Sequence, residues 1–388
     1  MPSKRLLIYS QDGMGLGHLR RTRNIAREVL AREPDARVLA LVDAPDAPFF
    51  PRLPGMDFVK LPTIVKTGPS DWRTPSQDDA GDLVSTRSRI MLEAFRDFSP
   101  DGVLIDHMPV GARGELRPML DEKSNAKFFL SLRDVLDAPE VVRDVWSGVG
   151  AYDYLPRYDT VLVHGIEEIF DADAAYGLRD RAQRMVYNHY VAPRAVAHDA
   201  LDNGAAPFVL VTGGGGADAF PLAETFLRAL PIVLAATPLR ALVLTGPNMP
   251  AAQRERLVAA AATHPVEVRE SVSDATELLA RASAVVTMGG YNTLCEVLAW
   301  RKPALVVPRA GPSAEQRIRS RLFADRGLVR MIEPDALTPD ALAEGLLGLL
   351  ADGGLPQEAN VPPLDGAARA AALLIERLDA VAGAPARA

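Results

Sequence analysis

The stretch 284–316 constrains the fold of this chain more than any other part of the sequence. It reads as an apolar strand, a turn that contains Gly289 and Gly290, a helix, and a second apolar strand that stops at Pro308. The expected elements are a strand at 284–288, a helix at 292–300 and a strand at 304–307. Such a series forms a right-handed βαβ unit, in which the amides and the dipole of the helix start favour an anion. The stretch therefore predicts an α/β domain that binds phosphate at this turn.

Glu296 adds a second recognition element to this unit. It lies on the first turns of the expected helix, where a carboxylate can accept hydrogen bonds from both hydroxyls of a vicinal diol. A phosphate at the turn and a diol one helical turn away together describe a nucleotide. The alternative is an ordinary βαβ unit in which Glu296 is solvated and pairs with Arg301.

The pattern of strand, glycine-rich loop and helix occurs at two further places in the chain. An apolar strand at 208–212 is followed by four consecutive glycines, and a strand at 5–10 is followed by Gly13, Gly15 and Gly17. A chain of 388 residues, 48% of them hydrophobic, is long enough for two cores. We therefore expect two Rossmann-like domains joined by a weakly patterned linker. The expected boundaries are 1–195 and 205–365, followed by a helix at 366–384 that packs back on the first domain.

Polar residues follow two of the expected strands of the first domain. His18 stands at a helix start, where an imidazole is available as a base or as a phosphate donor, and Arg20 lies in the same turn. A strand expected at 98–107 ends in Asp106 and His107. Because the carboxyl ends of strands line the ligand crevice of an open α/β sheet, we expect these two residues to meet His18 as acid and base groups. The alternatives are that His18 caps its helix and that Asp106 is a helix N-cap.

The glycine and histidine loop at 13–18 and the stretch 289–316 resemble MurG-like glycosyltransferases, the family of the cell-wall N-acetylglucosaminyltransferase, with its family 28 type of C-terminal domain. The resemblance implies a GT-B fold, in which two Rossmann-like domains with parallel sheets face each other across a cleft. It places the acceptor on the first domain and a nucleotide-sugar donor on the second. His18 and Arg20 also resemble the corresponding loop of PseG-like UDP-sugar hydrolases, which share the fold but transfer the sugar to water.

The resemblance also implies the reaction and the roles of single residues. It implies inverting transfer of a sugar such as an N-acetylhexosamine from a UDP-type donor to an acceptor hydroxyl. His18 is the first candidate for the base or phosphate donor, Asp106 is the second, and His107 lies beside them. The implied donor-binding residues are Gly213, Gly214, Gly215, Gly216, Ser271, Val272, Met288, Gly289, Gly290, Asn292, Thr293, Glu296 and Gln316. The implied phosphate-side residues are Gly15, Gly17, Arg20 and Arg309.

Within this set, the resemblance places the backbone around Ser271 and Val272 at the uracil edge and Glu296 on the ribose. It places the four-glycine loop on the phosphates and Gln316, in a loop, on the sugar hydroxyls. No metal or other cofactor is expected, because loop amides, helix dipoles and arginines would meet the charge of the leaving group. The sequence 171–173 has the spacing of a DxD metal motif, but it lies in a polar, helix-like stretch and reads as solvated surface.

Three other functions remain as alternatives: a UDP-sugar hydrolase, a nucleotide-sugar 2-epimerase, and a non-catalytic nucleotide-sugar sensor or scaffold.

The composition limits the classes of partner that the protein can bind. Lys plus Arg is 43 and Asp plus Glu is 50, and the resulting net charge of −7 disfavours nucleic acid. The single cysteine, Cys295, excludes a disulfide framework and a cysteine-built zinc site, and we expect it to be packed.

Neither a signal-peptide pattern nor an apolar run of roughly 20 residues is present, so we expect a cytoplasmic protein. The expected partners are the nucleotide-sugar donor and an acceptor that is a small molecule, a glycan or a lipid-linked compound. A peripheral membrane contact and the oligomeric state stay open.

Overall fold

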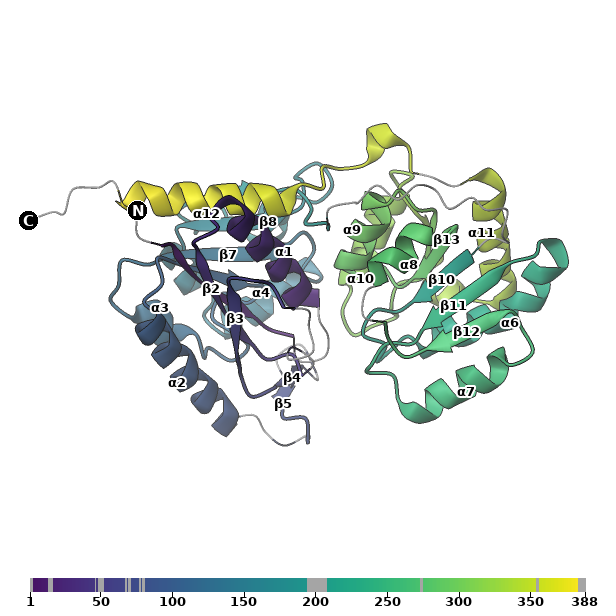
Figure 1. Cartoon of the computed structure of the whole chain (residues 1–388), viewed down its shortest axis with the longest axis horizontal. Coiled ribbons are helices and arrows are strands. Elements are labelled where there is room, and N and C mark those ends of the chain that lie inside the picture. The colour runs from purple at the N-terminus through teal and green to yellow at the C-terminus, as the bar shows by residue number, and fades with distance from the viewer. Residues whose placement is uncertain are drawn as a thin grey trace, which may run out of the picture. The chain divides into compact units, whose positions relative to one another are not determined.

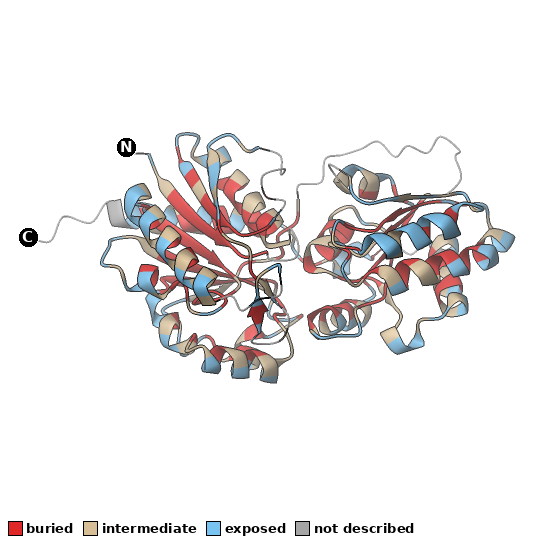
Figure 2. Ribbon diagram, turned by 90° about the horizontal axis from the view of Figure 1, so that it is seen from below, coloured by how far each residue is buried: buried red, intermediate tan, exposed pale blue. Residues whose placement is uncertain are grey.

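The computed structural model describes residues 3–12, 17–45, 47, 52–66, 68, 71–76, 78, 81–193, 208–272, 275–353 and 356–382. The chain divides into two compact units (Figure 1). The first comprises Met1–Val191 and Pro363–Ala388, and the second comprises Ala192–Pro362. Each unit has a parallel sheet and a hydrophobic core of its own. In both units the sheet strands are mostly buried, whereas the covering helices expose one face (Figure 2).

The described part of the first domain contains a seven-stranded parallel sheet with the order β3-β2-β1-β6-β7-β8-β9. Its strands are β1 (Arg5–Ser10), β2 (Arg37–Val42), β3 (Met56–Lys60), β6 (Gly102–Asp106), β7 (Lys127–Arg133), β8 (Thr160–His164) and β9 (Met185–Tyr187). A short antiparallel pair, β4 (Val65–Lys66) and β5 (Trp72–Arg73), lies outside this sheet. Since β1 is followed in sequence by β2 on one side and pairs with β6 on the other, the topological switch point lies between β1 and β6.

The helices of the first domain cover both faces of this sheet (Figure 1). They are α1 (Gly17–Arg32), α2 (Gly81–Phe98), α3 (Arg117–Asp121), α4 (Pro139–Gly148), α5 (Ala172–Tyr176) and α12 (Gly366–Ala382), with a 3₁₀ helix at Tyr152–Arg157. The C-terminal helix α12 packs against α1, and Arg377 on α12 forms two hydrogen bonds of 2.8 and 2.7 Å with Asp159. The last helix of the chain therefore belongs to the first domain.

The second domain contains, within its described residues, a six-stranded parallel sheet with the order β12-β11-β10-β13-β14-β15. Its strands are β10 (Phe208–Thr212), β11 (Arg240–Leu244), β12 (Val266–Arg269), β13 (Ala284–Thr287), β14 (Ala304–Val306) and β15 (Arg330–Met331). Its helices are α6 (Phe220–Ala236), α7 (Ala251–Ala261), α8 (Ala275–Arg281), α9 (Tyr291–Ala299), α10 (Glu315–Ala324) and α11 (Pro339–Asp352), with 3₁₀ helices at Pro334–Ala336 and Glu358–Asn360. Here the switch point lies between β10 and β13.

Two of the differences between expected and observed elements concern candidate site residues. The strand expected within 98–107 begins only at Gly102, because α2 runs to Phe98 and ends where Ser99 adopts a φ of 45° before Pro100. The loop expected to carry Gln316 ends earlier, and Gln316 is the second residue of α10. No described helix combines the length and the apolar character that a membrane span requires.

Candidate functional site

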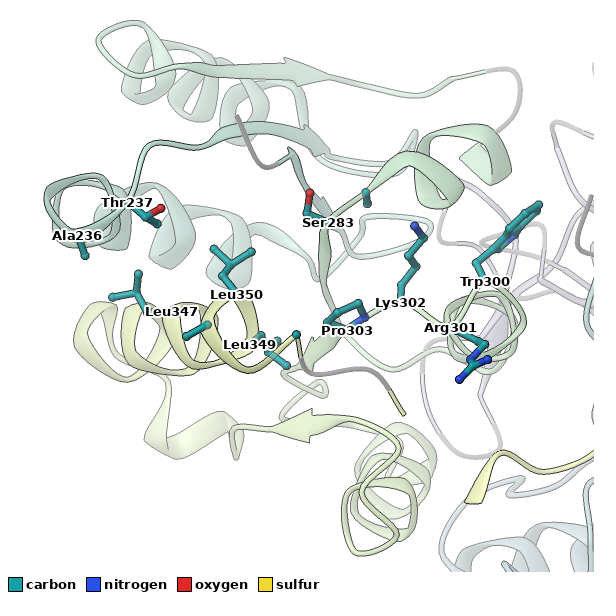
Figure 3. Close-up of a pocket in the computed structure, with 13 residues that line it drawn as sticks. Ala236, Thr237, Ser283, Trp300, Arg301, Lys302, Pro303, Leu347, Leu349 and Leu350 are labelled. Atoms are coloured by element: carbon teal, nitrogen blue, oxygen red, sulfur yellow. The ribbon is translucent and has the colours of Figure 1, made fainter. Parts of the chain in front are cut away.

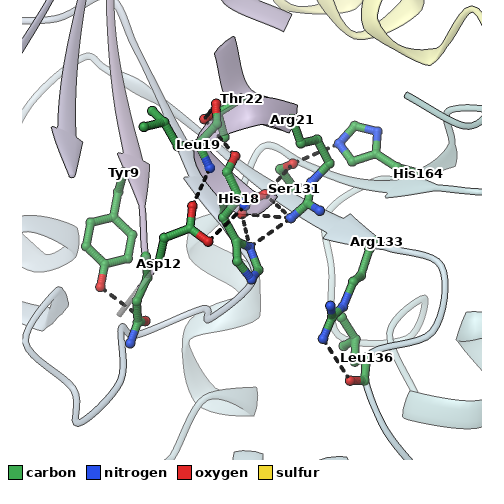
Figure 4. Close-up of polar contacts among 12 residues, drawn as sticks. Tyr9, Asp12, His18, Leu19, Arg21, Thr22, Ser131, Arg133, Leu136 and His164 are labelled. Atoms are coloured by element: carbon green, nitrogen blue, oxygen red, sulfur yellow. Dashed lines mark hydrogen bonds and ion pairs between the residues drawn. The ribbon is translucent and has the colours of Figure 1, made fainter. Parts of the chain in front are cut away.

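The first cluster of candidate residues lies at the switch point of the first domain. His18 is the second residue of α1, which follows β1, and Asp106 is the last residue of the neighbouring strand β6. His18 Nδ1 lies 2.5 Å from Asp106 Oδ2, so the sequence-predicted pair meets within one domain (Figure 4 labels His18 and its neighbour Arg21). Asp106 is fully buried, whereas the His18 side chain keeps 17% of its surface exposed. In this pair a buried carboxylate holds an imidazole that stays partly accessible.

Arg21 is a third member of this cluster and contacts both oxygens of Asp106. Its Nη2 lies 2.8 Å from each oxygen of Asp106, and its Nε lies 3.2 Å from Oδ1. Burial by itself would raise the pKa of Asp106, but the Arg21 guanidinium and His18 hold that pKa well below its usual value. Asp106 is thus an ionised hydrogen-bond acceptor, and the alternative that it caps a helix is wrong.

The short contact between His18 and Asp106 fixes the tautomer of the imidazole. Two lone pairs at 2.5 Å would repel each other, so a proton lies between Nδ1 and Oδ2, and the low pKa of Asp106 places it on Nδ1. The unprotonated Nε2 makes no hydrogen bond to any described residue and can accept a proton. This arrangement is the orientation of a general base by a carboxylate.

Asp12, which follows β1, holds the start of α1 in place. Its carboxylate accepts hydrogen bonds from the backbone N–H groups of His18 (3.0 Å) and Leu19 (2.5 Å). Its own N–H donates to Asp43, which forms an ion pair with the fully buried Arg87 at 3.1 Å. Since Asp12 caps the helix, the alternative that His18 is the capping group is wrong, and the imidazole is available for chemistry.

His107 lies directly beside the pair. Its ring centroid is 4.9 Å from that of His18, and its backbone adopts a φ of 72° at the end of β6. Burial, together with the neighbouring His18 ring and the positive charge of Arg133, lowers the pKa of His107 well below its usual value. His107 is therefore a neutral ring packed against His18, and its role as an acid or base stays a prediction.

The phosphate-side residues of the first domain are placed only in part. Gly17 begins α1, and Arg20 lies half-buried in its first turn. Gly15 lies outside the described residues. Asp106 is met by Arg21 and not by Arg20.

The second cluster lies at the switch point of the second domain, where two glycine turns are neighbours. Gly213 follows β10 and Met288 follows β13, and the register pairs the last residues of these strands. A Cβ atom on Gly213 would lie 3.0 Å from the Met288 sulfur, so the two turns touch. Neither α6 nor α9, which follow these turns, has a side-chain N-cap. The two helix starts therefore direct their amides to the same edge of the sheet, as an anion site requires.

The glycines of these turns serve two purposes. Gly216 and Gly289 have φ values of 92° and 79°, and a Cβ atom there would lie 2.0 Å from the Thr245 carbonyl oxygen and 2.3 Å from Ser320 Oγ, respectively. At Gly214 and Gly290, a Cβ atom would meet no described atom within 4 Å. The first two glycines are thus needed for packing, whereas the other two border open space that a ligand can enter.

Glu296 lies on α9 and is 5% exposed. Arg301 pairs with Glu358 at 3.4 Å, so the alternative of a solvated Glu296 paired with Arg301 is wrong. Asn292 and Thr293 are partly buried in the first turn of α9, and Met288 and Cys295 are buried.

Gln316 on α10 is buried, and its Oε1 accepts a hydrogen bond of 3.2 Å from the Arg309 backbone. The Arg309 side chain forms an ion pair of 3.2 Å with Asp218, just after the four-glycine loop. Gly215 accepts a bond from the Asn248 backbone (2.9 Å). Ser271 is exposed and Val272 half-buried after β12, and their contact with a base stays a prediction.

The expected surface character of residues 171–173 has a structural basis. Asp171 is the N-cap of α5 and accepts from Ala174, while Asp173 accepts from two backbone N–H groups. Within the described ranges, no three His, Cys, Asp or Glu side chains gather as a metal site would need.

A cavity of about 910 Å³ in the second domain does not coincide with the glycine turns (Figure 3). It lies before β13 and β14, at the opposite edge of the sheet, where α6, α9 and α11 end. Lys302 there is half-buried, and burial lowers its pKa. Helix C-termini attract cations, and this accounts for a lysine at the place where three helices end.

Sequence reasoning missed several members of the first cluster. Arg21 follows His18 by three residues, a spacing that places both on one helix face and so was available as a signal. Ser131, two residues before the end of β7, and His164, the last residue of β8, extend the hydrogen-bond network behind Asp106. Only their position next to Asp106 in the sheet could have indicated them. That position follows from the order of the strands, which the sequence pattern does not give.

Comparison with known proteins finds a family similarity that covers most of the second domain. Residues 208–372 match the family described as the glycosyltransferase family 28 C-terminal domain. A curated relative from Lactococcus lactis, UDP-N-acetylglucosamine--N-acetylmuramyl-(pentapeptide) pyrophosphoryl-undecaprenol N-acetylglucosamine transferase, is 26% identical over 156 residues. That match covers 40% of this chain and 43% of the relative, so the similarity spans less than half the length of either protein.

Two solved structures are similar along nearly the whole chain. The glycosyltransferase of kitacinnamycin has a TM-score of 0.65 at 20% identity and covers 97% of this chain and 100% of its own. MurG of Acinetobacter baumannii has a TM-score of 0.59 at 14% identity and covers 99% and 100%. The predicted α/β class, with two Rossmann-like domains of the GT-B type, is thereby confirmed, as is the resemblance to MurG-like proteins.

Proposed function

Because residues 208–372 are a glycosyltransferase family 28 C-terminal domain within a chain of GT-B fold, we propose that this protein transfers a sugar from a UDP-sugar donor to an acceptor hydroxyl. The observation that carries the proposal is the 2.5 Å contact that leaves Nε2 of His18 as a base oriented by Asp106. The relative from Lactococcus lactis uses UDP-N-acetylglucosamine according to its name, and this supports an N-acetylhexosamine as the sugar.

The proposed reaction is a single displacement. His18 Nε2 removes the proton of the acceptor hydroxyl while its oxygen bonds to the anomeric carbon. The bond from that carbon to the phosphate oxygen breaks on the opposite face, and UDP leaves with the electron pair. The proton stays on Nε2, and Asp106 stabilises the resulting imidazolium. One displacement inverts the anomeric configuration.

The second domain supplies the binding of the donor in this proposal. The amides at the starts of α6 and α9 and the open space at Gly214 and Gly290 support a diphosphate at the two glycine turns. Glu296 would accept the ribose hydroxyls and Gln316 would contact the sugar. We propose that these amides and helix dipoles, and no bound metal, stabilise the leaving diphosphate.

The test combines donor binding with turnover. UDP-sugars should raise the melting temperature more than GDP-, dTDP- and ADP-sugars do, and UDP release should depend on an added acceptor hydroxyl and resist EDTA. The acceptor panel contains small molecules, glycans and lipid-linked sugars. UDP release at the same rate without any acceptor would indicate hydrolysis and contradict transfer.

His18→Gln should lower kcat by roughly 10²–10⁴-fold with donor binding retained, since it removes the base alone. His264→Gln, the same change just beyond the end of α7 in the second domain, is the matched control and should leave kcat unchanged. NMR of the product should show an inverted anomeric centre.

A further inference from the structure

The carboxylate behind His18 is the end of a longer chain of hydrogen bonds. Ser131 Oγ lies 3.1 Å from Asp106 Oδ1 and 2.8 Å from Nε2 of His164. Nδ1 of His164 lies 3.1 Å from Nδ2 of Asn188, which also lies 2.7 Å from the Gly366 carbonyl oxygen. The chain runs through the carboxyl-terminal halves of β6, β7 and β8 to Asn188, the residue after β9, and reaches the first residue of α12 (Figure 4 labels Ser131 and His164).

The chemistry of these groups gives every hydrogen bond one direction. The Gly366 carbonyl can only accept, so Asn188 presents its NH₂ group to it and, with the second hydrogen, to Nδ1 of His164. Burial, followed by the charge of Arg21, lowers the pKa of His164 to about 3, and the ring is neutral. A neutral ring that accepts at Nδ1 carries its proton on Nε2 and donates it to Ser131 Oγ. The Ser131 hydrogen then points to Asp106 Oδ1.

All four members of this chain are buried. Ser131, His164 and Asp106 are 0% exposed and Asn188 is 1% exposed, so water does not compete for these bonds. Ser131 and Asp106 are register partners on neighbouring strands, and this register places the hydroxyl beside the carboxylate. Packing alone does not explain a buried serine and histidine here. Two apolar side chains of similar volume would fill the same space and would leave no buried polar atoms in need of hydrogen bonds.

We propose that Ser131, His164 and Asn188 are positioning residues that add a hydrogen-bond donor to the ionised Asp106 and thereby set the basicity of His18. The inference rests on the proposed function only for its catalytic consequence. Its structural content, the state of the His18 ring, can be measured without donor or acceptor.

The physical reason is the distribution of charge on Asp106. Together with the two hydrogen bonds from Arg21 to Oδ1, donation from Ser131 draws negative charge toward Oδ1 and away from Oδ2, the oxygen that faces His18. Without that donation, more charge gathers on Oδ2 and the protonated form of His18 becomes more stable. The other charged or titratable groups that face His18 are Arg21, the His107 ring and Asp12, and the variants below change none of them.

The test is an NMR pH titration of the His18 ring nitrogens in the full chain. The wild type should show the Nδ1–H tautomer in the neutral form. Ser131→Ala should raise the titration midpoint of His18 by about half a pH unit, with the Nδ1–H tautomer kept in the neutral form. Ser131→Thr, which keeps the hydroxyl on a β-strand, is the matched control and should titrate like the wild type. His164→Phe should reproduce the effect of Ser131→Ala, and Asn188→Asp, which cannot donate to His164, should shift the midpoint in the same direction.

An unchanged midpoint in folded Ser131→Ala would overturn the proposal. Should His164→Phe not fold, Ser131→Ala decides alone, because it removes a single oxygen. In assays of transfer, the acid limb of the pH profile of kcat/KM should move upward with the midpoint of His18. If the ring shifts as expected but no acceptor supports turnover, the positioning chain stands and the proposed function fails. If turnover depends on His18 but Ser131→Ala shifts nothing, the proposed function stands and the positioning chain fails.

Discussion

Gly289→Ala is the most informative perturbation of the second domain, because its cost can be worked out from the structure. The backbone there has a φ of 79°, which costs an alanine about 1–2 kcal/mol. The added Cβ would also lie 2.3 Å from Ser320 Oγ and 2.9 Å from Val306 Cγ1, and overpacking of this kind costs roughly 1–3 kcal/mol. The sum, about 2–5 kcal/mol, should lower the melting temperature of this domain by roughly 5–15 °C.

A neighbouring glycine provides the matched control. At Gly290 the backbone has a φ of −60°, and a Cβ would meet nothing within 4 Å. Gly290→Ala should therefore leave the melting temperature within about 1 °C. If the donor phosphates occupy that open space, the same variant should weaken binding of a UDP-sugar roughly tenfold, about 1.4 kcal/mol. The pair separates a glycine kept for its conformation from one kept for ligand access.

Ser320 allows the overlap to be separated from the backbone cost. Its buried hydroxyl has no hydrogen-bond partner among the described residues, so Ser320→Ala alone should be nearly neutral. In the Gly289→Ala background it should restore about 1–2 kcal/mol, the part due to the overlap with Oγ. Calorimetry of the full chain measures the transition of the second domain in all four proteins. A Gly289→Ala protein as stable as the wild type would refute the reasoning.

Two further predictions concern single carboxylates. Glu296→Gln should weaken the binding of a UDP-sugar by roughly 1–3 kcal/mol in calorimetric titration, because a neutral amide replaces the charged acceptor of the ribose hydroxyls; an unchanged Kd would place the ribose elsewhere. Burial raises the pKa of Asp12 from 3.8 to about 6, despite its two backbone hydrogen bonds. A folded-state pKa above the unfolded value means that protonation favours folding, so this contribution is present below about pH 4 and is lost as the pH rises through 6, by up to about 3 kcal/mol. Urea unfolding at pH 4 to 7 should show the stability of the wild type falling relative to Asp12→Asn over this range, and a constant difference would contradict the assignment.

The sequence by itself determined the elements that depend on local pattern. Arg5–Ser10 and Phe208–Thr212 are strands with the bounds that their apolar runs indicate, because a run of buried residues between polar ends has few other stable forms. Gly289 was recognisable for a similar reason, since a turn directly after a strand requires a backbone conformation that other residues rarely adopt. The resemblance to a GT-B protein followed from these same turns.

Only the tertiary structure decided which polar groups meet. Asp106 lies 85 positions from Arg21 and 25 from Ser131, and nothing local to any of them selects these partners. The selection comes from the register of β1, β6 and β7, a non-local property that depends on how the whole sheet is packed. A hydrogen bond forms or fails over a few tenths of an ångström, whereas an apolar run tolerates larger displacements. The sequence therefore indicated the fold and the end of the sheet that bears the chemistry, and the pairing of strands decided the atoms.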